Sequence, residues 1–435
     1  MVLERRLWIG AYVFAWLMPI ALLAFAPRPV DDGPLLFALA IGFIAFAGMT
    51  LQVAVASRAP LFTAPMGIDL LLRMHRAMGT MVAVLVIAHV GVLFIKEPWA
   101  RSWLWPPPLH GPLVAQLGFL GLMMLALLVA SSLWRPRWLS YERWRVVHLI
   151  GTVGAIGGSY GHILKASDYS SLPLVRWYAL VLVVLAGIML VYLRVGRVFI
   201  AQGRPYTLVG IRAEHGDVTT VQLEADGHDG IHLAPGQFAW LRLGGSPYSI
   251  NEHPFSLSSS AIDPRHPEFS IKASGDYTRT IRDLQIGTRV LLDGPHGAWE
   301  PALPACGFVL IVGGIGVTPA MSIIRTMADL ADDRPVDLIY GARTWDDVSF
   351  REELAHLAER MNLRITFVLS SPEPGWAGRT GYISRELLEE AFPADAAQRN
   401  VVVCGPPPMM HATVDALHEL GIPEAHVRIE RFEAV

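Results

Sequence analysis

Six apolar stretches, each about as long as a bilayer is thick, occupy the first 200 residues. A helix needs about 20 apolar residues to cross the hydrocarbon core of a membrane. The stretches fall at 7–26, 35–56, 72–95, 112–133, 146–164 and 174–195. The pattern therefore predicts a membrane α-helical bundle of six spans, within a domain at residues 1–200.

The second half of the chain has a different pattern of apolar runs and turn residues. After residue 204, short runs rich in β-branched and aromatic residues, such as 206–211, 218–223 and 238–243, alternate with Gly, Pro and Asp turns. Runs of this kind are typical of antiparallel strands. We expect a small antiparallel β-barrel at residues 201–300.

A strand, a Gly-rich turn and a helix follow one another from residue 308 to residue 330. Further strand-like runs come at 336–340, 364–369 and 400–404, with helical stretches between them. This alternation predicts a parallel sheet in an α/β doubly wound domain at residues 301–435.

Charge divides the chain at the same place. Residues 1–200 carry 16 Lys and Arg against 7 Asp and Glu, whereas residues 201–435 carry 19 against 31. With the N-terminus in the cytoplasm, eleven arginines of the membrane half fall on the inner side and five basic residues fall outside. The positive-inside rule then predicts that the soluble half is cytoplasmic. The expected partners include the lipid bilayer but no nucleic acid.

Four histidines stand out in the apolar half. His75 and His89 are fourteen residues apart, as are His148 and His162. Fourteen residues are just under four helical turns, so each pair lies on one helix face, ~21 Å apart along the axis. Spans three and five run in the same direction, so the histidines match in depth. This geometry suits two stacked haems, each held between imidazoles of two helices.

Other interpretations of these histidines remain open. A lone histidine in a membrane helix is often a hydrogen-bonded packing residue, and zinc or copper are rival metals, although zinc prefers four ligands around one point. Two equal spacings favour haem. Glycines near the pairs predict either close approach of a flat macrocycle or close helix packing: Gly79, Gly91, Gly151, Gly154, Gly157 and Gly158.

Three motifs in the soluble half suit nucleotide cofactors. One offers hydroxyls, a cation and backbone N–H groups to a pyrophosphate, the second places glycines between a strand and a helix N-terminus, and the third ends a parallel strand where ligands of such folds bind. They comprise His253, Pro254, Phe255, Ser256, Lys272, Gly275 and Thr278; then Gly313, Gly314, Gly316, Thr318 and Pro319; then Cys404, Gly405 and Pro406. Alone, Cys404 would be interpreted as a small buried hydrophobe. The only other cysteine is Cys306, which excludes a plant-type iron–sulfur cluster.

The order of these motifs, with Gly-Pro-His-Gly at 294–297, resembles the ferredoxin–NADP reductase superfamily. Joined to six spans and paired histidines, it resembles the bacterial type of the NADPH oxidase and ferric reductase transmembrane family over nearly the whole chain. The resemblance implies an enzyme of the inner cell membrane. It would pass electrons from NAD(P)H through FAD and two b-type haems to an extracytoplasmic acceptor, a ferric chelate or oxygen giving superoxide. Flavin is needed because nicotinamide gives two electrons as hydride whereas a haem takes one.

The resemblance also implies a role for each motif residue. His253 to Ser256 would contact the flavin and its ribityl chain, and Lys272, Gly275 and Thr278 its pyrophosphate. The Gly313 to Pro319 turn would hold the diphosphate of the dinucleotide. Cys404, Gly405 and Pro406 would border the nicotinamide, and Glu430 and Phe432 are similar to the family's acidic residue and flavin-covering terminal aromatic. Three residues follow Phe432 here.

Two points stay open at this stage. Superoxide-forming relatives carry a histidine where this chain has Leu93, so the acceptor is not specified. Arg343, just after the second strand of the parallel sheet, would meet a 2′-phosphate of NADPH or be a solvated surface charge. The alternative function is a membrane-anchored flavin reductase without haem that passes electrons to a membrane partner or quinone.

Overall fold

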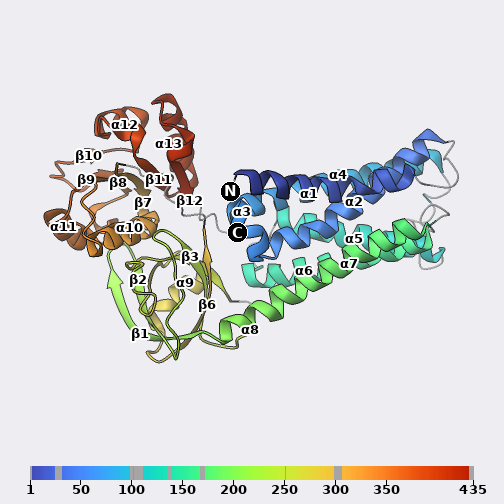
Figure 1. Ribbon diagram of the computed structural model, residues 1–435, viewed down its shortest axis with the longest axis horizontal. Coiled ribbons are helices and arrows are strands. Elements are labelled where there is room, and N and C mark those ends of the chain that lie inside the picture. The colour runs from blue at the N-terminus through green and yellow to red at the C-terminus, as the bar shows by residue number, and fades with distance from the viewer. Residues whose placement is uncertain are drawn as a thin grey trace. The chain divides into compact units, whose positions relative to one another are not determined.

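The computed structural model describes residues 2–24, 32–97, 101, 111–134, 139–166, 172–249, 251–297 and 306–430. The chain divides into two compact units, Met1–Val198 and Phe199–Val435. Figure 1 shows the first as a bundle of helices and the second as two sheets with helices around them.

Among its described residues, the first unit has seven α-helices up to Val191. They are α1 (Val2–Ala24), α2 (Gly33–Ala56), α3 (Pro60–Met66), α4 (Ile68–Lys96), α5 (Leu113–Leu133), α6 (Tyr141–Lys165) and α7 (Pro173–Val191). A π-helical turn, Tyr192–Gly196, joins α7 to α8 (Arg197–Gln202). The long helices lie side by side, with α4 along α2 and α6 along α5.

Five helices of the described residues are long and apolar enough to span a membrane. They are Arg5–Ala24, Gly33–Ala56, Leu70–Lys96, Leu113–Leu133 and Pro173–Gln202. The remaining expected span, 146–164, is indeed helical, within α6, but it is outside this set. Its two histidines and several glycines lower its hydropathy, so the count of six spans remains a prediction.

An antiparallel sheet begins the second unit. Its strands are β1 (Pro205–Glu214), β2 (Val218–Ala225), β3 (Phe238–Leu243), β4 (His253–Ser256), β5 (Glu268–Lys272) and β6 (Arg289–His296), in the order β4-β3-β6-β1-β2-β5. The edge strands are linked just beyond β4, where Leu257 forms a bridge with Phe269 and the Ser258 N–H donates to the Glu268 carbonyl at 2.8 Å. The antiparallel sheet is confirmed; the closed barrel remains a prediction.

The second sheet of this unit is parallel throughout. Its strands are β7 (Phe308–Gly313), β8 (Val336–Ala342), β9 (Leu363–Leu369), β10 (Arg379–Thr380), β11 (Asn400–Cys404) and β12 (Val427–Glu430), in the order β10-β9-β8-β7-β11-β12. Four helices accompany it: α10 (Val317–Asp329), α11 (Arg351–Arg360), α12 (Arg385–Ala391) and α13 (Pro407–Glu419).

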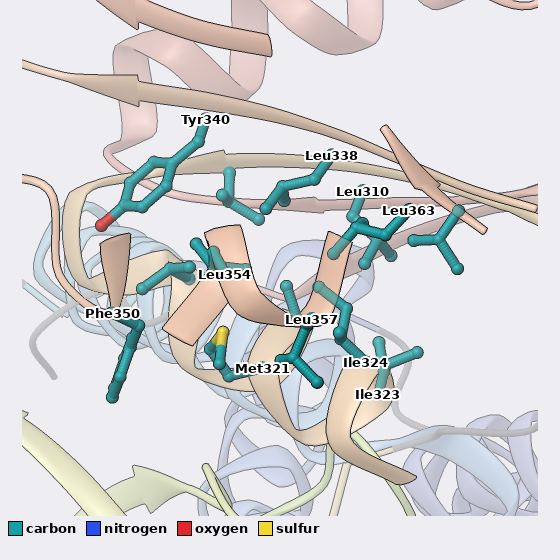
Figure 2. Close-up of a cluster of buried hydrophobic side chains, with 14 of the residues drawn as sticks. Leu310, Met321, Ile323, Ile324, Leu338, Tyr340, Phe350, Leu354, Leu357 and Leu363 are labelled. Carbon is teal, nitrogen blue, oxygen red and sulfur yellow. The ribbon is translucent and has the colours of Figure 1, made fainter. Parts of the chain in front are cut away.

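Helices cover both faces of the parallel sheet. Because successive side chains of a strand point to opposite faces, Leu310 packs with α10 and α11, whereas Ile311 packs with α12 and α13. Figure 2 shows the first of these layers, with Leu338 and Tyr340 of β8 above Met321 of α10. The buried Tyr340 hydroxyl accepts a hydrogen bond from the Ser349 N–H at 3.1 Å. The expected doubly wound α/β arrangement is therefore present.

Candidate functional site

The four histidines of the membrane half meet as two pairs. Helix α4 carries His75 and His89, and α6 carries His148 and His162. The ring centroids of His75 and His148 are 6.1 Å apart, and those of His89 and His162 are 6.5 Å apart. Each pair thus joins one residue from each helix.

Both separations fit an iron ion between two imidazoles. Two metal–nitrogen bonds of about 2 Å, with the ring radii added, place the centroids roughly 6 Å apart. The described residues contain no group of three or more His, Cys, Asp or Glu side chains that could hold a metal ion. Two imidazoles are the axial donor set that a haem with no open coordination site requires.

One pair is oriented by backbone carbonyls. The Nδ1 atom of His89 lies 2.8 Å from the Ala38 carbonyl of α2, and Nδ1 of His162 lies 2.8 Å from the Val114 carbonyl of α5. A carbonyl only accepts hydrogen bonds, so the proton of each ring is on Nδ1. Each Nε2 is left with a lone pair that is available to a metal.

Two glycines make this approach sterically feasible, and the sequence analysis did not identify them. A Cβ built on Gly42 would lie 2.7 Å from Nδ1 of His89, and one on Gly118 would lie 2.8 Å from Nδ1 of His162. Both distances are shorter than real Cβ contacts. A glycine inside an apolar span was the available signal, but nothing local distinguishes these two from other glycines of the bundle.

The other pair is held differently. Nδ1 of His148 lies 3.4 Å from the Ser132 hydroxyl, which donates to the Leu128 carbonyl at 2.7 Å. Nδ1 of His75 is buried and finds no hydrogen-bond partner of good geometry among the described residues, with the Gln52 backbone beside it. The two pairs therefore differ in what orients their rings.

The glycines predicted near the pairs separate into two groups. Cβ atoms on Gly151, Gly154 and Gly158 would collide with Leu128, Met124 and the Gly121 backbone of α5. These three glycines therefore serve close helix packing. A Cβ on Gly79 would lie 3.5 Å from the Gln52 side chain, and nothing lies within 4 Å of one on Gly91 or Gly157.

The flavin-motif residues lie on β4, β5 and the short helix α9 (Asp276–Arg279). His253 stacks on Tyr277 of α9, with the ring centroids 4.2 Å apart. The Thr278 hydroxyl accepts hydrogen bonds from the Ser274 and Gly275 N–H groups at 3.0 and 2.9 Å. Thr278 therefore orders the turn between β5 and α9.

The remaining flavin-motif residues are on the same strands. Pro254 and Phe255 pair with β3, Ser256 is buried, and Lys272 is the last residue of β5. Strand β5 also contacts the 3-10 turn Gly314–Gly316. The structure thus brings the flavin motif and the Gly-rich turn together within one unit.

The Gly-rich turn lies between β7 and α10. Gly314 has a φ of +55°, which glycine adopts without strain, and nothing lies within 4 Å of a Cβ built there. A Cβ on Gly316 would lie 2.4 Å from the Cys404 carbonyl. Gly316 therefore permits the end of β11 to pack against the turn, while Gly314 leaves open space beside the start of α10.

The residues around this turn help to shape it. The buried Thr318 hydroxyl donates to the Ile315 carbonyl at 3.0 Å, and Pro319 is buried in the first turn of α10. A Cβ on Gly313 would lie 2.9 Å from Pro406 Cδ, and one on Gly405 would lie 3.0 Å from the Gly313 nitrogen. The second and third nucleotide motifs therefore meet at one edge of the parallel sheet.

Two predicted catalytic residues are neighbours at that edge. Cys404 ends β11 and is opposite Glu430 at the end of β12. A Cβ on Gly297 would lie 3.7 Å from Glu430 Oε1, so the carboxylate reaches the Gly-Pro-His-Gly segment of the other sheet. Arg343 follows β8 and is exposed. The third predicted catalytic residue, Phe432, lies outside the described residues.

Arg325 of α10 joins the two sheets, and the sequence analysis did not identify it. Its guanidinium donates to the Ser258 carbonyl at 2.6 Å and to both carboxylate oxygens of Glu353 at 2.7 and 2.6 Å. A charged residue on an amphipathic helix usually indicates a solvated face, so its sequence context gave no signal. Nearby, the Ala261 N–H donates to the Thr326 hydroxyl at 2.9 Å.

Comparison with known families agrees with this division of the chain. Residues 41–159 match the ferric reductase like transmembrane component, a range that includes three of the four histidines. Residues 310–415 match the oxidoreductase NAD-binding domain, a range that includes the Gly-rich turn and Cys404.

Curated relatives match the soluble half. NADH-cytochrome b5 reductase 1 of Aspergillus terreus is 34% identical over 159 residues, which cover 35% of this chain and 54% of that protein. The Candida glabrata protein of the same name is 31% identical over 191 residues, covering 42% and 66%. The chain thus spans about half to two thirds of the length of these relatives.

A solved flavohemoglobin from Malassezia yamatoensis is similar in fold alone, at 18% identity and a TM-score of 0.51, covering 91% of this chain and 96% of that one. The family matches carry more information because each falls on one of the units described above. The chain is therefore an oxidoreductase that joins a ferric reductase-like transmembrane domain to an oxidoreductase NAD-binding domain similar to that of NADH-cytochrome b5 reductases.

Proposed function

We propose that this protein carries electrons from NAD(P)H through FAD and two b-type haems to an acceptor on the far side of a membrane. The observation that carries the proposal is the meeting of four histidines as two pairs, with centroids 6.1 and 6.5 Å apart. Packing alone gives no reason for two such pairs at matching positions on two helices. Ionisable groups inside a membrane domain are in most cases functional.

The histidines would be the axial ligands of the two haems, His75 with His148 and His89 with His162. A bound haem supplies one-electron redox chemistry. Two imidazoles per iron leave no position for a gas or substrate, so the chain's own residues favour outer-sphere electron transfer. The pairs are ~21 Å apart along each helix, which gives the pathway its length across the bilayer.

The soluble unit would bind the donor and the flavin. His253 to Ser256, Lys272, Gly275 and Thr278 are the proposed flavin contacts. FAD, when bound, takes two electrons from a nicotinamide and releases them singly. Gly314 and the α10 N-terminus form the proposed binding site of the dinucleotide diphosphate, because free backbone N–H groups at a helix start favour anions. Cys404 and Glu430 would then flank the nicotinamide.

The proposed direction is from the cytoplasm outward, in a bacterial inner membrane. The excess of basic residues on one side of the membrane half supports a cytoplasmic N-terminus and a cytoplasmic soluble unit. In that orientation the His75–His148 pair is the inner one and receives electrons first. The His89–His162 pair delivers them to a ferric chelate or to oxygen.

The test is the visible spectrum of the purified full-length protein, measured before and after anaerobic addition of NADH or NADPH. We expect two haems per chain with a low-spin b-type spectrum that becomes reduced. Protein that retains FAD but binds no haem would contradict this proposal and would favour the membrane-anchored flavin reductase. Steady-state oxidation with ferric chelates, oxygen and quinones then identifies the acceptor.

A further inference from the structure

The two outer-pair histidines are seated in the same way on different helices. His89 approaches Ala38 and Gly42 of α2, and His162 approaches Val114 and Gly118 of α5. In both cases the glycine is four residues after the residue whose carbonyl accepts the Nδ1–H bond. The same device, a carbonyl that accepts the Nδ1–H bond followed four residues later by a glycine, thus occurs in two separate helix pairs.

The device has a simple physical basis. In a helix, the carbonyl of residue i bonds to the N–H of residue i+4, which here is the glycine. A carbonyl oxygen has two lone pairs, so it accepts the imidazole as a second donor only if the ring comes close. Any side chain at i+4 would push the ring away from the carbonyl, because its Cβ would lie only 2.7 or 2.8 Å from Nδ1.

His148 of the inner pair lacks this device, while His75 has the Gln52 backbone beside its ring. On α5, Ser132 lies four residues after Leu128, the position that a glycine holds in the outer pair. Its hydroxyl donates a hydrogen bond to the Leu128 carbonyl at 2.7 Å. His148 then faces that hydroxyl at 3.4 Å rather than a carbonyl. The 3.4 Å contact of His148 is longer than an ordinary N–H···O hydrogen bond, so it polarises the imidazole less than the 2.8 Å bonds of the outer pair do.

From this difference we propose that Gly42 and Gly118 are positioning residues that make the two haem sites electronically unequal. They set the short Nδ1–H bonds of His89 and His162, and Ser132 sets the longer contact of His148. A strong Nδ1–H bond raises the basicity of Nε2, so the His89–His162 site stabilises ferric iron more and has the lower midpoint potential. The inference rests on the proposed function, in which both pairs bind haem.

The experiment is a spectroscopic redox titration, with low-spin EPR, of purified full-length protein. Gly42→Ala and Gly118→Ala each shift one and the same haem component to higher potential and leave the other in place. Gly187→Ala on α7 is the matched control, since nothing lies within 4 Å of a Cβ there, and it changes neither component. Ser132→Ala shifts the other component instead.

The inference is overturned if Gly42→Ala and Gly118→Ala keep full haem content with both components unchanged, or if they move the component that Ser132→Ala moves. Wild-type protein without haem would overturn the proposed function itself, which is a different result. If the glycine variants do not fold, pulsed EPR of wild-type protein in D₂O decides. The expected result is a slowly exchanging Nδ1 deuteron at one haem only, and equal exchange at both would contradict the inference.

Discussion

The guanidinium of Arg325 faces the carboxylate of Glu353 through two parallel hydrogen bonds, Nε to Oε1 at 2.7 Å and Nη2 to Oε2 at 2.6 Å. A third N–H of the same group reaches the Ser258 carbonyl, just beyond β4. The Arg325 side chain is only 12% exposed. One residue of α10 therefore connects the parallel sheet's helices to the antiparallel sheet.

Removing this connection should weaken the soluble unit. We expect Arg325→Gln to lower the free energy of unfolding by about 2 kcal/mol, because it removes a mostly buried, charge-assisted bidentate bond. Flavin release on heating full-length protein measures the effect. Arg379→Gln is the control, since its ion pair with Glu390 is more than half exposed on both sides and is worth less than about 1 kcal/mol. Equal effects of both variants would contradict the role given to Arg325.

A methyl group on Gly316 should disrupt the Gly-rich turn. Gly316→Ala places a Cβ against the Cys404 backbone, so the turn and the end of β11 must separate. We expect a loss of NAD(P)H binding of about tenfold or more. Gly421→Ala is the control, because it also places a Cβ at a positive φ, +74°, with nothing within 4 Å. It costs about 1–2 kcal/mol of backbone strain away from the turn. Dinucleotide titration monitored by flavin fluorescence compares the two variants, and equally weak binding by both would contradict the role given to Gly316.

The pairing of Cys404 with Glu430 predicts a defect in hydride transfer. Cys404→Ala and Glu430→Gln should each slow reduction of FAD by NAD(P)H about tenfold or more, with FAD content and reduction by dithionite unchanged. Stopped-flow absorbance of the flavin under anaerobic conditions gives the rate. Unchanged rates for both variants would mean that these residues only pack.

Arg343 provides a test of cofactor preference. If it meets the 2′-phosphate, Arg343→Gln should raise KM for NADPH roughly tenfold, as expected for one lost charge-assisted bond, and leave KM for NADH unchanged. Steady-state kinetics with both donors separates the interpretations. A similar small change with both donors identifies Arg343 as a solvated surface charge.

Loss of one histidine should interrupt the pathway at a defined point. In His148→Ala we expect about half of the haem to be lost and the remaining haem no longer to be reduced by NAD(P)H, while FAD is still reduced. Anaerobic difference spectra record both changes. Undiminished electron flow to an external ferric chelate in this variant would exclude the proposed order of sites.

Much of the fold follows from local pattern. Apolar stretches near twenty residues long and the fourteen-residue spacing of His75 and His89 depend only on helix geometry, so their placement on one helix was predictable. The same is true of the turn between β7 and α10, where glycines follow a fully buried strand. The span at α6 was harder to assign from hydropathy. The glycines that let α6 pack against α5, and the histidines that it contributes to the pairs, also lower its hydropathy.

What required the tertiary structure is the set of contacts between residues far apart in the chain. The Ala38 carbonyl meets His89, Gly42 makes room for it, and Arg325 reaches Ser258. No local periodicity encodes these contacts, since each depends on how two elements pack. Sequence pattern thus determined which residues share a face, while packing decided which backbone atom each functional side chain meets, because that depends on interatomic distances of a few ångströms between separate elements.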